Sequence, residues 1–197
     1  MNRRFFFLAF LALLGCTHGT KFEPPSYDSI VLKETTRQEV LKRFGKPYSE
    51  GKILKEEQSI LSLSYAHATG GFATGHGGGS VIPARAMVYQ FVEDLLVGYS
   101  YSSSYEDDHT DFDESKIAEI KKGETTKDQL IALVGPPRGK CVYPMIPGKD
   151  DEGLTWNYGQ TSRRAFGKLH NYMKHLIVGI GPDGKVTNVE YASRGER

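Results

Sequence analysis

The sequence contains only two cysteines, Cys16 and Cys141, among its 197 residues. It also lacks a strong charge of either sign, because its 25 basic and 24 acidic side chains almost cancel. Proteins that bind nucleic acid usually carry a clustered basic surface, so this balance predicts no nucleic-acid partner. The chain also lacks an apolar run of the roughly 20 residues that a membrane-spanning helix needs.

Patterns typical of enzymes are missing as well. There is no Gly-x-Ser-x-Gly motif, and Gly70–Gly75 has the spacing of a phosphate loop but is followed by His76 instead of lysine. Structural zinc sites usually show local ligand spacing, yet no two histidines stand four residues apart and no Cys-x-x-Cys occurs. We therefore expect no enzyme, no cofactor and no metal. A metal-dependent enzyme remains a third alternative, using His67, His76, His109, His170 and His175.

The first fifteen residues have the pattern of an export signal. Arg3 and Arg4 provide positive charge, and an unbroken apolar run follows from Phe5 to Leu14. This run has the length of a signal-peptide core. It ends at Gly15 and Cys16, and a cysteine at this point resembles the lipobox of bacterial lipoproteins.

The lipobox resemblance implies a processed lipoprotein. Residues 1–15 would be removed as the signal peptide, Cys16 would carry palmitate and other acyl chains, and residues 16–28 would form a tether. Buried acyl chains anchor a protein because each methylene contributes ~0.8 kcal/mol. Thr17 replaces the aspartate typical of lipoproteins kept at the inner membrane, which implies an outer-membrane location facing the periplasm.

Processing would also change the charge and the thiol content. Without Arg3 and Arg4, 23 basic and 24 acidic side chains remain, a formal charge of −1. Once Cys16 is lipidated, Cys141 is the single thiol left, so no internal disulfide can form. We expect Cys141 to be a small buried apolar side chain.

An internal repeat appears when the chain is aligned with itself at a shift of ninety residues, because residues 34–47 match residues 124–137 without a gap. Each copy predicts one short helix with its own start and stop signals. A threonine followed three residues later by Glu or Gln forms a capping box, and a glycine then a proline end the helix. The paired signals are Thr36 and Glu39, Thr126 and Gln129, Gly45 and Gly135, and Pro47 and Pro137.

Strand-like sequence follows each predicted helix. Alternating apolar residues predict antiparallel strands, and Asp183-Gly184 predicts a hairpin turn. The predicted fold class is α+β, with two tandem units that each pack short helices on a three- to four-stranded antiparallel sheet, either side by side or sharing a continuous sheet. The units are expected at 29–103 and 115–197, joined by a solvated acidic linker at 104–114. The predicted strands are 60–65, 86–91, 95–101, 154–158, 175–180 and 186–191, and short helices are expected at 29–32 and 115–120.

The repeat resembles the SmpA/OmlA family of lipoproteins, which includes BamE-like proteins of β-barrel assembly. The second copy carries the resemblance in Gly123–Thr126, Leu133–Pro137, Trp156–Tyr158 and Gly181–Val186, whereas Lys33 replaces the leading glycine in the first copy. The resemblance implies two helices on a three-stranded sheet. Its duplication in one chain resembles the β-lactamase inhibitor protein fold.

These observations predict a non-catalytic, lipid-anchored protein of the cell envelope. We expect it to bind a protein partner, in outer-membrane protein assembly or envelope integrity. The alternative is an inhibitor-type binding protein of the β-lactamase inhibitor fold, acting as a concave clamp on a periplasmic or secreted enzyme. Large rings are frequent at interfaces, and the candidate interface residues on predicted strands are Tyr65, Tyr89, Tyr99, Tyr101, Trp156 and Tyr158.

Two further segments have no specific assignment from the sequence. The glycine-rich segment 68–80 is predicted to be a flexible loop that a partner could order. A basic stretch with Arg163, Arg164, Lys168 and Lys174 is predicted either to form a solvated hairpin tip or to touch anionic lipid head groups.

Overall fold

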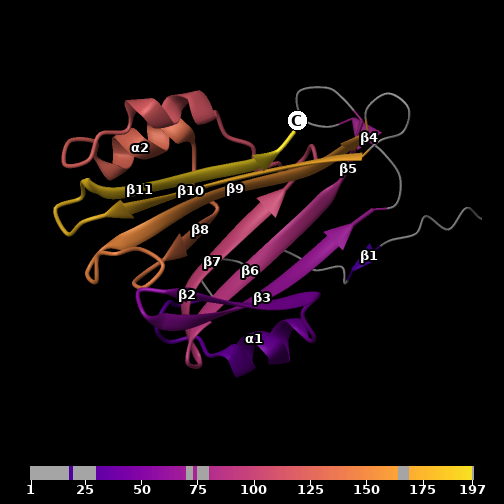
Figure 1. Ribbon diagram of the computed structural model, residues 1–197, viewed down its shortest axis with the longest axis horizontal. Helices are drawn as coiled ribbons and strands as arrows, with labels where there is room; N and C mark the ends of the chain where they lie inside the picture. Colours follow the sequence, from indigo (N-terminus) through magenta and orange to yellow (C-terminus); the bar gives the residue numbers. More distant parts are fainter. Residues whose placement is uncertain (1–17, 20–29, 70–72, 75–79, 164–168, 197) are drawn as a thin grey trace, which may run out of the picture.

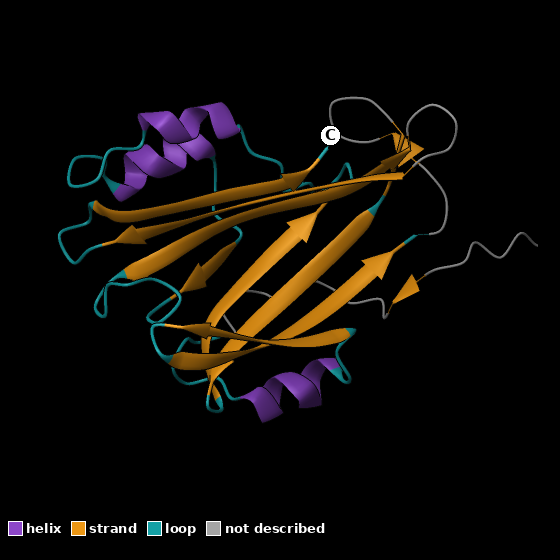
Figure 2. Ribbon diagram, in the orientation of Figure 1, coloured by secondary structure: helices purple, strands orange, loops and turns teal. Residues whose placement is uncertain are grey.

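The computed structural model describes residues 18–19, 30–69, 73–74, 80–163 and 169–196. Within this part, 52% of residues lie in strands and 14% in helices. The strands form one antiparallel sheet that curls into a half-barrel, with short helices on its outside (Figures 1 and 2). The predicted α+β class is therefore wrong, because the strands far outweigh the few short helices and form one curled half-barrel instead of two units with helices packed on sheets.

The elements follow one another along the chain with mostly short connections. None of the helices in the described ranges has the length and hydropathy that crossing a bilayer requires. The sheet order is β1-β3-β6-β7-β8-β9-β10-β11, with β2 also on β3, β4 on β5, and β5 on β9. The bounds are β1 His18–Gly19, α1 Arg37–Phe44, β2 Ser49–Lys55, β3 Gln58–Ala68, β4 Ala73–Thr74, β5 Ser80–Ile82, β6 Ala84–Val92, β7 Leu95–Ser103, the 3-10 helix η2 Glu114–Glu119, α2 Lys127–Val134, β8 Gly139–Cys141, β9 Glu152–Arg163, β10 Leu169–Ile180 and β11 Val186–Gly195.

Both predicted helix starts are confirmed. The Thr36 hydroxyl accepts a hydrogen bond from the amide of Glu39, and the Glu39 carboxylate accepts one from the amide of Thr36. Thr126 and Gln129 make the same reciprocal pair at the start of α2. Each box satisfies two amides that the first helical turn would otherwise leave unpaired.

The predicted helix ends are confirmed in position but differ in conformation. Gly45 has φ 72° and ψ −152°, and Gly135 has φ 94° and ψ 179°. These angles lie outside the left-handed helical region that a glycine at a helix end usually adopts, in a region that only glycine adopts without strain. The chain therefore leaves each helix abruptly and turns toward the next strand.

The predicted strands are found, and several are longer than expected. The Asp183-Gly184 turn joins β10 to β11, and the turn at Glu93 and Asp94 joins β6 to β7. The helix expected at 29–32 does not form over its described residues 30–32, whereas η2 matches the one expected at 115–120. The sequence analysis missed β2 and the three-residue strand β8.

Strand β8 is the seam between the two halves of the sheet. It pairs with β7 on one side and with β9 on the other. Glycines permit this close approach: a Cβ at Gly139 would lie 2.1 Å from the Tyr99 carbonyl oxygen, and one at Gly153 would lie 2.3 Å from the Cys141 sulfur. Larger side chains at these positions would separate the strands, so these glycines allow one continuous sheet.

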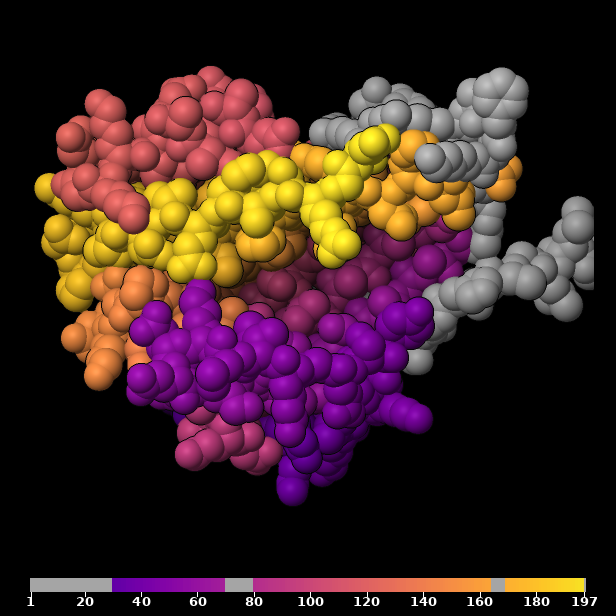
Figure 3. All heavy atoms as spheres, viewed as in Figure 1, coloured from indigo at the N-terminus to yellow at the C-terminus, as the bar shows by residue number. Residues whose placement is uncertain are grey.

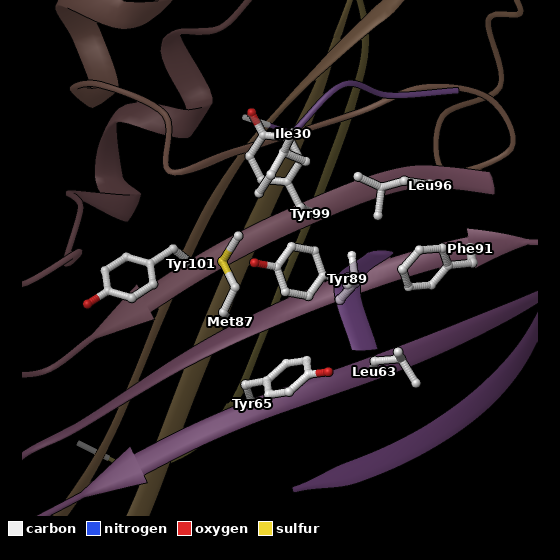
Figure 4. Close-up of a cluster of buried hydrophobic side chains, with 10 residues drawn as sticks. Ile30, Leu63, Tyr65, Met87, Tyr89, Phe91, Leu96, Tyr99 and Tyr101 are labelled. Atoms are coloured by element: carbon white, nitrogen blue, oxygen red, sulfur yellow. The ribbon is translucent and has the colours of Figure 1, made fainter. Parts of the chain in front are cut away.

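Two buried clusters lie beneath the helices on the outer face of the sheet. In the first, α1 packs its Val40 and Phe44 against the tyrosine-rich face of β3, β6 and β7 (Figure 4). In the second, α2 packs Leu130 and Val134 against β9, β10 and β11. Burial of such apolar side chains contributes most of the favourable free energy of folding.

A third buried cluster lies on the opposite, inner face of the sheet. It combines Ile60 of β3, Val97 of β7 and Cys141 of β8 with Met145 and Ile146 from the segment after β8. This cluster fills one end of the inner face. Because Ile60 and Val97 belong to the first half and the others to the second, it joins the two halves through a shared core.

The acidic linker is solvated only in part, because Glu106, Asp107, Asp113 and Glu114 are exposed whereas Asp108 and Asp111 contact the sheet. Asp108 accepts hydrogen bonds from Tyr101 and Ser103 and pairs with Arg85. Asp111 pairs with Lys174 at 2.8 Å, and both of those side chains are buried. These carboxylates are therefore structural partners of the sheet.

Candidate binding surface

Beyond its buried end, the inner face of the sheet is open. Side chains alternate along a strand, so the residues between the core positions of β3, β6 and β7 point inward. They are small and partly exposed, and strand register arranges them in rows: Ser64, Val88 and Ser100 in one, and Ala66, Ala86 and Ser102 in the next.

The small side chains leave a hollow that is visible on the molecular surface. Figure 3 shows it between β11, in yellow, and the β2–β3 hairpin, in purple, with the colours of β6 and β7 at its floor. We call this hollow the inner groove, with the two rows of small residues as its floor. Its walls are the β2–β3 hairpin on one side and strands β10 and β11 on the other.

Both walls carry exposed apolar side chains. Ile53 of β2 is 50% exposed and lies opposite Ile60, which belongs to the inner cluster. Met173 of β10 is 59% exposed and lies opposite Gly159. Exposed methionine and isoleucine beside a groove favour a partner surface, since apolar contacts supply most binding free energy.

Charged side chains on the inner face are few. Register places Lys55, Arg163, Glu190 and Arg194 there. The Lys55 ammonium lies 2.9 Å from a carboxylate oxygen of Glu190, so these two charges neutralise each other. The rest of this set is basic, which favours neutral or acidic partner groups over basic ones.

The described residues do not assemble a recognisable catalytic centre. Among them, no group of three or more His, Cys, Asp or Glu side chains is placed to hold a metal ion. Cys141 is buried as expected, and burial raises the pKa of its thiol to about 12. A thiol of that pKa is protonated at neutral pH and is a poor nucleophile.

The six aromatic residues expected at an interface all lie in the core. Tyr65, Tyr89, Tyr99 and Tyr101 pack beneath α1, Trp156 packs beneath α2, and Tyr158 is buried on the same outer face. None is more than 4% exposed. Their side chains point to the outer face of the sheet, whereas the open surface is on the inner face.

Two of these rings have a defined structural role. The Tyr65 hydroxyl donates to the carbonyl oxygen of Gly45 at 2.9 Å, and the Trp156 indole donates to that of Gly135 at 3.0 Å. Each hydrogen bond fixes the end of the helix that packs on the ring. The repeat noticed in the sequence thus extends to the helix–sheet contacts.

Other predicted site residues fall in different places. Cys16 and His76 lie outside the described residues, as does most of the segment 68–80. A middle part of that segment is described, since Ala73–Thr74 pairs with β5, which pairs with β9. Arg164 and Lys168 also lie outside the described residues, while Lys174 is buried rather than at a solvated tip.

The histidines do not converge. His67 of β3 lies opposite Arg85, on the outer face, whereas His175 lies on the inner face of β10. His170 contacts Glu196 at 3.1 Å. The third alternative, an enzyme using these histidines with a metal, has no supporting geometry among the described histidines.

An acidic pocket of about 280 Å³ lies on the outer face, beside the linker. Glu106 to Phe112 line one side, and Gly135, Arg138 and Trp156 line the other. Asp108 and Asp111, two of its carboxylates, already pair with Arg85 and Lys174. The inner groove is therefore the better candidate for a binding surface.

The sequence contains a signal for this groove, in the spacing of small residues along β3 and β6. Small residues recur at every second position of β3 and β6, in Ser62-x-Ser64-x-Ala66-x-Ala68 and Ala84-x-Ala86. Such a pattern indicates a strand face that is neither core nor charged surface. The tyrosines at the intervening positions instead predicted a binding surface on the opposite face.

Comparison with known proteins gives limited support to the expected families. No family model matches the chain, and no curated protein matches it, so the SmpA/OmlA resemblance gains no support. One similar solved structure is described as a "putative beta-lactamase inhibitor protein" from Streptococcus mutans. It is 13% identical, covers 84% of this chain and 92% of that one, and gives a TM-score of 0.38.

The fold and the groove together define the class of protein to which the chain can be assigned. The chain is a mostly β protein with a curled antiparallel sheet, helices on its outer face and an accessible inner face.

Proposed function

We propose that this chain is a non-catalytic binding protein that receives a projecting segment of a partner protein in its inner groove. The observation that carries the proposal is the open, small-residue floor formed by Ser64, Val88 and Ser100 between two walls that each present an exposed apolar side chain. A groove floor built on paired strands holds its shape, which lowers the entropic cost of binding.

A crosslinking experiment tests this proposal. A photoreactive amino acid at Met173 faces the groove, and the same group at Leu54, which is 77% exposed on the outer side of β2, serves as the control. We expect one discrete adduct from Met173 and none from Leu54 in intact cells. Equal labelling from both positions would contradict a groove-directed partner.

Filling the groove provides the matching loss-of-binding test. Ser64→Arg places a long side chain on the floor, whereas Ser59→Arg places the same side chain at an exposed position on the outer side of β3. The Met173 adduct should disappear with Ser64→Arg and persist with Ser59→Arg. Both variants must keep the wild-type circular dichroism spectrum.

Inhibition of a periplasmic or secreted hydrolase is the more specific form of this function. A groove that grips a loop beside an active site would block that site, as the clamp alternative requires. The Streptococcus mutans protein carries an inhibitor description, but a TM-score of 0.38 is too low to transfer it.

Purified chain should inhibit at least one β-lactamase or envelope hydrolase at micromolar concentration, and Ser64→Arg should abolish this. Absence of inhibition across a broad panel would remove the inhibitor form alone.

The anchor belongs to the same proposal. We infer that Cys16 is lipidated and holds the folded body at the periplasmic face of the outer membrane, because the cysteine ends an export signal. Metabolic labelling with a palmitate analogue should mark the wild-type chain and not Cys16→Ser. Equal labelling of the two would refute the anchor, and fractionation of labelled cells would identify the membrane.

A further inference from the structure

The two ends of the sheet meet at one point across the inner groove. Strand β2 pairs with β3 beside β1 at one edge of the sheet, and β11 is the other edge. Lys55, the last residue of β2, donates a 2.9 Å hydrogen bond to the Glu190 carboxylate of β11. Figure 3 shows the purple hairpin reaching the yellow strand at the narrow end of the hollow.

Three elements converge on this contact. The Lys55 ammonium also donates to the carbonyl oxygen of Met145 at 2.7 Å, and the Asn188 amide donates to the second oxygen of Glu190 at 3.0 Å. The side chain of Met145 is buried in the inner cluster beside Ile60 of β3. The ammonium is therefore held by the hairpin, by the segment after β8 and by β11 at once.

The hairpin has few other constraints on its free side. Six of the seven residues of β2 are exposed, and β2 pairs only with β3 within the described sheet. Its turn consists of Glu56 and Glu57 at φ 48° and 60°, a left-handed pair that normally favours Asn and Gly. Strand β3 is fixed by its pairing with β6 from Ile60 to Ala68, so the tip contact positions β2 and the turn.

The burial of the ion pair gives it a moderate strength. The side chains of Lys55 and Glu190 are 25% and 39% exposed, so water screens the pair only in part. Pairs of this kind open and close readily compared with a buried core. The contact is strong enough to hold the hairpin and weak enough to be released.

We propose that the Lys55–Glu190 pair is a latch that holds the β2–β3 hairpin against β11 and sets the width of the inner groove. With the latch closed, the groove admits a narrow segment of a partner. With the latch open, β2 and the turn of the hairpin move away from β11 and the groove widens, while β3 stays paired with β6. The latch sets the groove width in the free protein, without any partner. Its effect on partner binding rests on the proposed binding function.

Charge exchange tests the latch without any partner. Hydrogen–deuterium exchange of residues 53–60 and 187–191 should accelerate roughly three- to tenfold in Lys55→Glu and in Glu190→Lys. The double variant Lys55→Glu/Glu190→Lys restores opposite charges and should return to within about twofold of wild type. Lys121→Glu breaks the exposed 3.7 Å pair with Glu124 and should leave both segments unchanged.

The width of the groove needs a direct measurement. Spin labels at Glu50 and Ser193 stand on the outer sides of β2 and β11, and both positions are exposed. In a Cys16→Ser background, the label-to-label distance should lengthen and broaden in Lys55→Glu and recover in the double variant. Cys141 is buried and should not take up label.

Neutral variants keep the test decisive if a reversed charge prevents folding. Lys55→Met and Glu190→Gln remove the attraction without adding repulsion, and each should accelerate exchange in the same two segments. Unchanged exchange in every single variant, or a double variant as fast as the singles, would overturn the latch. Loss of partner binding with a normal latch would instead overturn the proposed function.

Discussion

At the scale of single residues, the repeat is most precise where the chain enters each helix. Lys33 has φ 66° and Gly123 has φ 75°, ninety residues apart. The Lys33 amide donates to the Leu96 carbonyl oxygen and the Gly123 amide to that of Val186. The replacement of glycine by Lys33 therefore does not change the entry geometry, but it leaves a lysine in a conformation that glycine adopts more easily.

Exchanging these residues should change stability in opposite directions. Lys33→Gly removes left-handed strain at an exposed position and should stabilise the protein by about 0.5–1 kcal/mol. Gly123→Lys adds the strain and should destabilise it by about 1–2 kcal/mol, although no atom lies within 4 Å of the new Cβ. Urea denaturation measures both. Lys42→Gly, in the middle of α1, is the control and should cost about 1 kcal/mol; a loss of that size at Lys33 would contradict the strain argument.

At the scale of elements, each helix is attached to the sheet by a small number of specific contacts. At the start of α2, Lys127 and Lys140 both contact the Glu152 carboxylate of β9, with Lys140 at 2.9 Å. Partial burial raises the pKa of Glu152, but the hydrogen bonds from the two lysines outweigh burial, so its pKa lies below the usual value. This carboxylate therefore links α2, β8 and β9.

The lowered pKa gives a prediction about acid stability. The unfolded chain binds a proton at Glu152 more readily than the folded chain does, so this contribution is present above the unfolded pKa of 4.5. It is lost as the pH falls through the lower folded value. Glu152→Gln should cost about 1 kcal/mol at pH 7 and have little effect near pH 3. Unfolding free energies across this range check it, and a parallel offset at every pH would contradict it.

At the scale of the whole molecule, a buried ion pair ties the linker to the second half. The Lys174 side chain is 2% exposed and lies 2.8 Å from Asp111. It also donates to the Phe112 carbonyl oxygen and lies 4.4 Å from the centre of the Phe112 ring. The linker thus covers an edge of the core beneath α2.

Replacing Lys174 should lower the free energy of unfolding by a large amount. Lys174→Met leaves the Asp111 carboxylate buried without its cation and should destabilise the protein by roughly 3–5 kcal/mol. The double variant Lys174→Met/Asp111→Asn removes both charges and should recover part of that loss. Lys116→Met, which breaks an exposed pair with Glu119, should cost less than about 1 kcal/mol. Calorimetric melting temperatures measure all three, and equal effects of Lys116→Met and Lys174→Met would contradict a structural role for the linker.

The sequence alone determined the features that depend on neighbouring residues. Capping boxes, helix-ending glycines and hairpin turns are set by side chains a few residues apart, so Thr36, Gly135 and Asp183-Gly184 were interpreted correctly as local signals. The internal repeat was visible for the same reason. The helix expected at 29–32 lacked such a signal and does not form over 30–32.

Only the tertiary structure decided how the two halves combine. The seam strand β8 has three residues, and its pairing depends on glycines on three different strands, which no local pattern reveals. The same packing decided which face of each strand is covered. It buried the tyrosines beneath α1 and left the small residues open, because the helices occupy the outer side of a sheet that curls inward. Local chemistry therefore fixed the elements, whereas long-range strand pairing fixed the fold class and the groove.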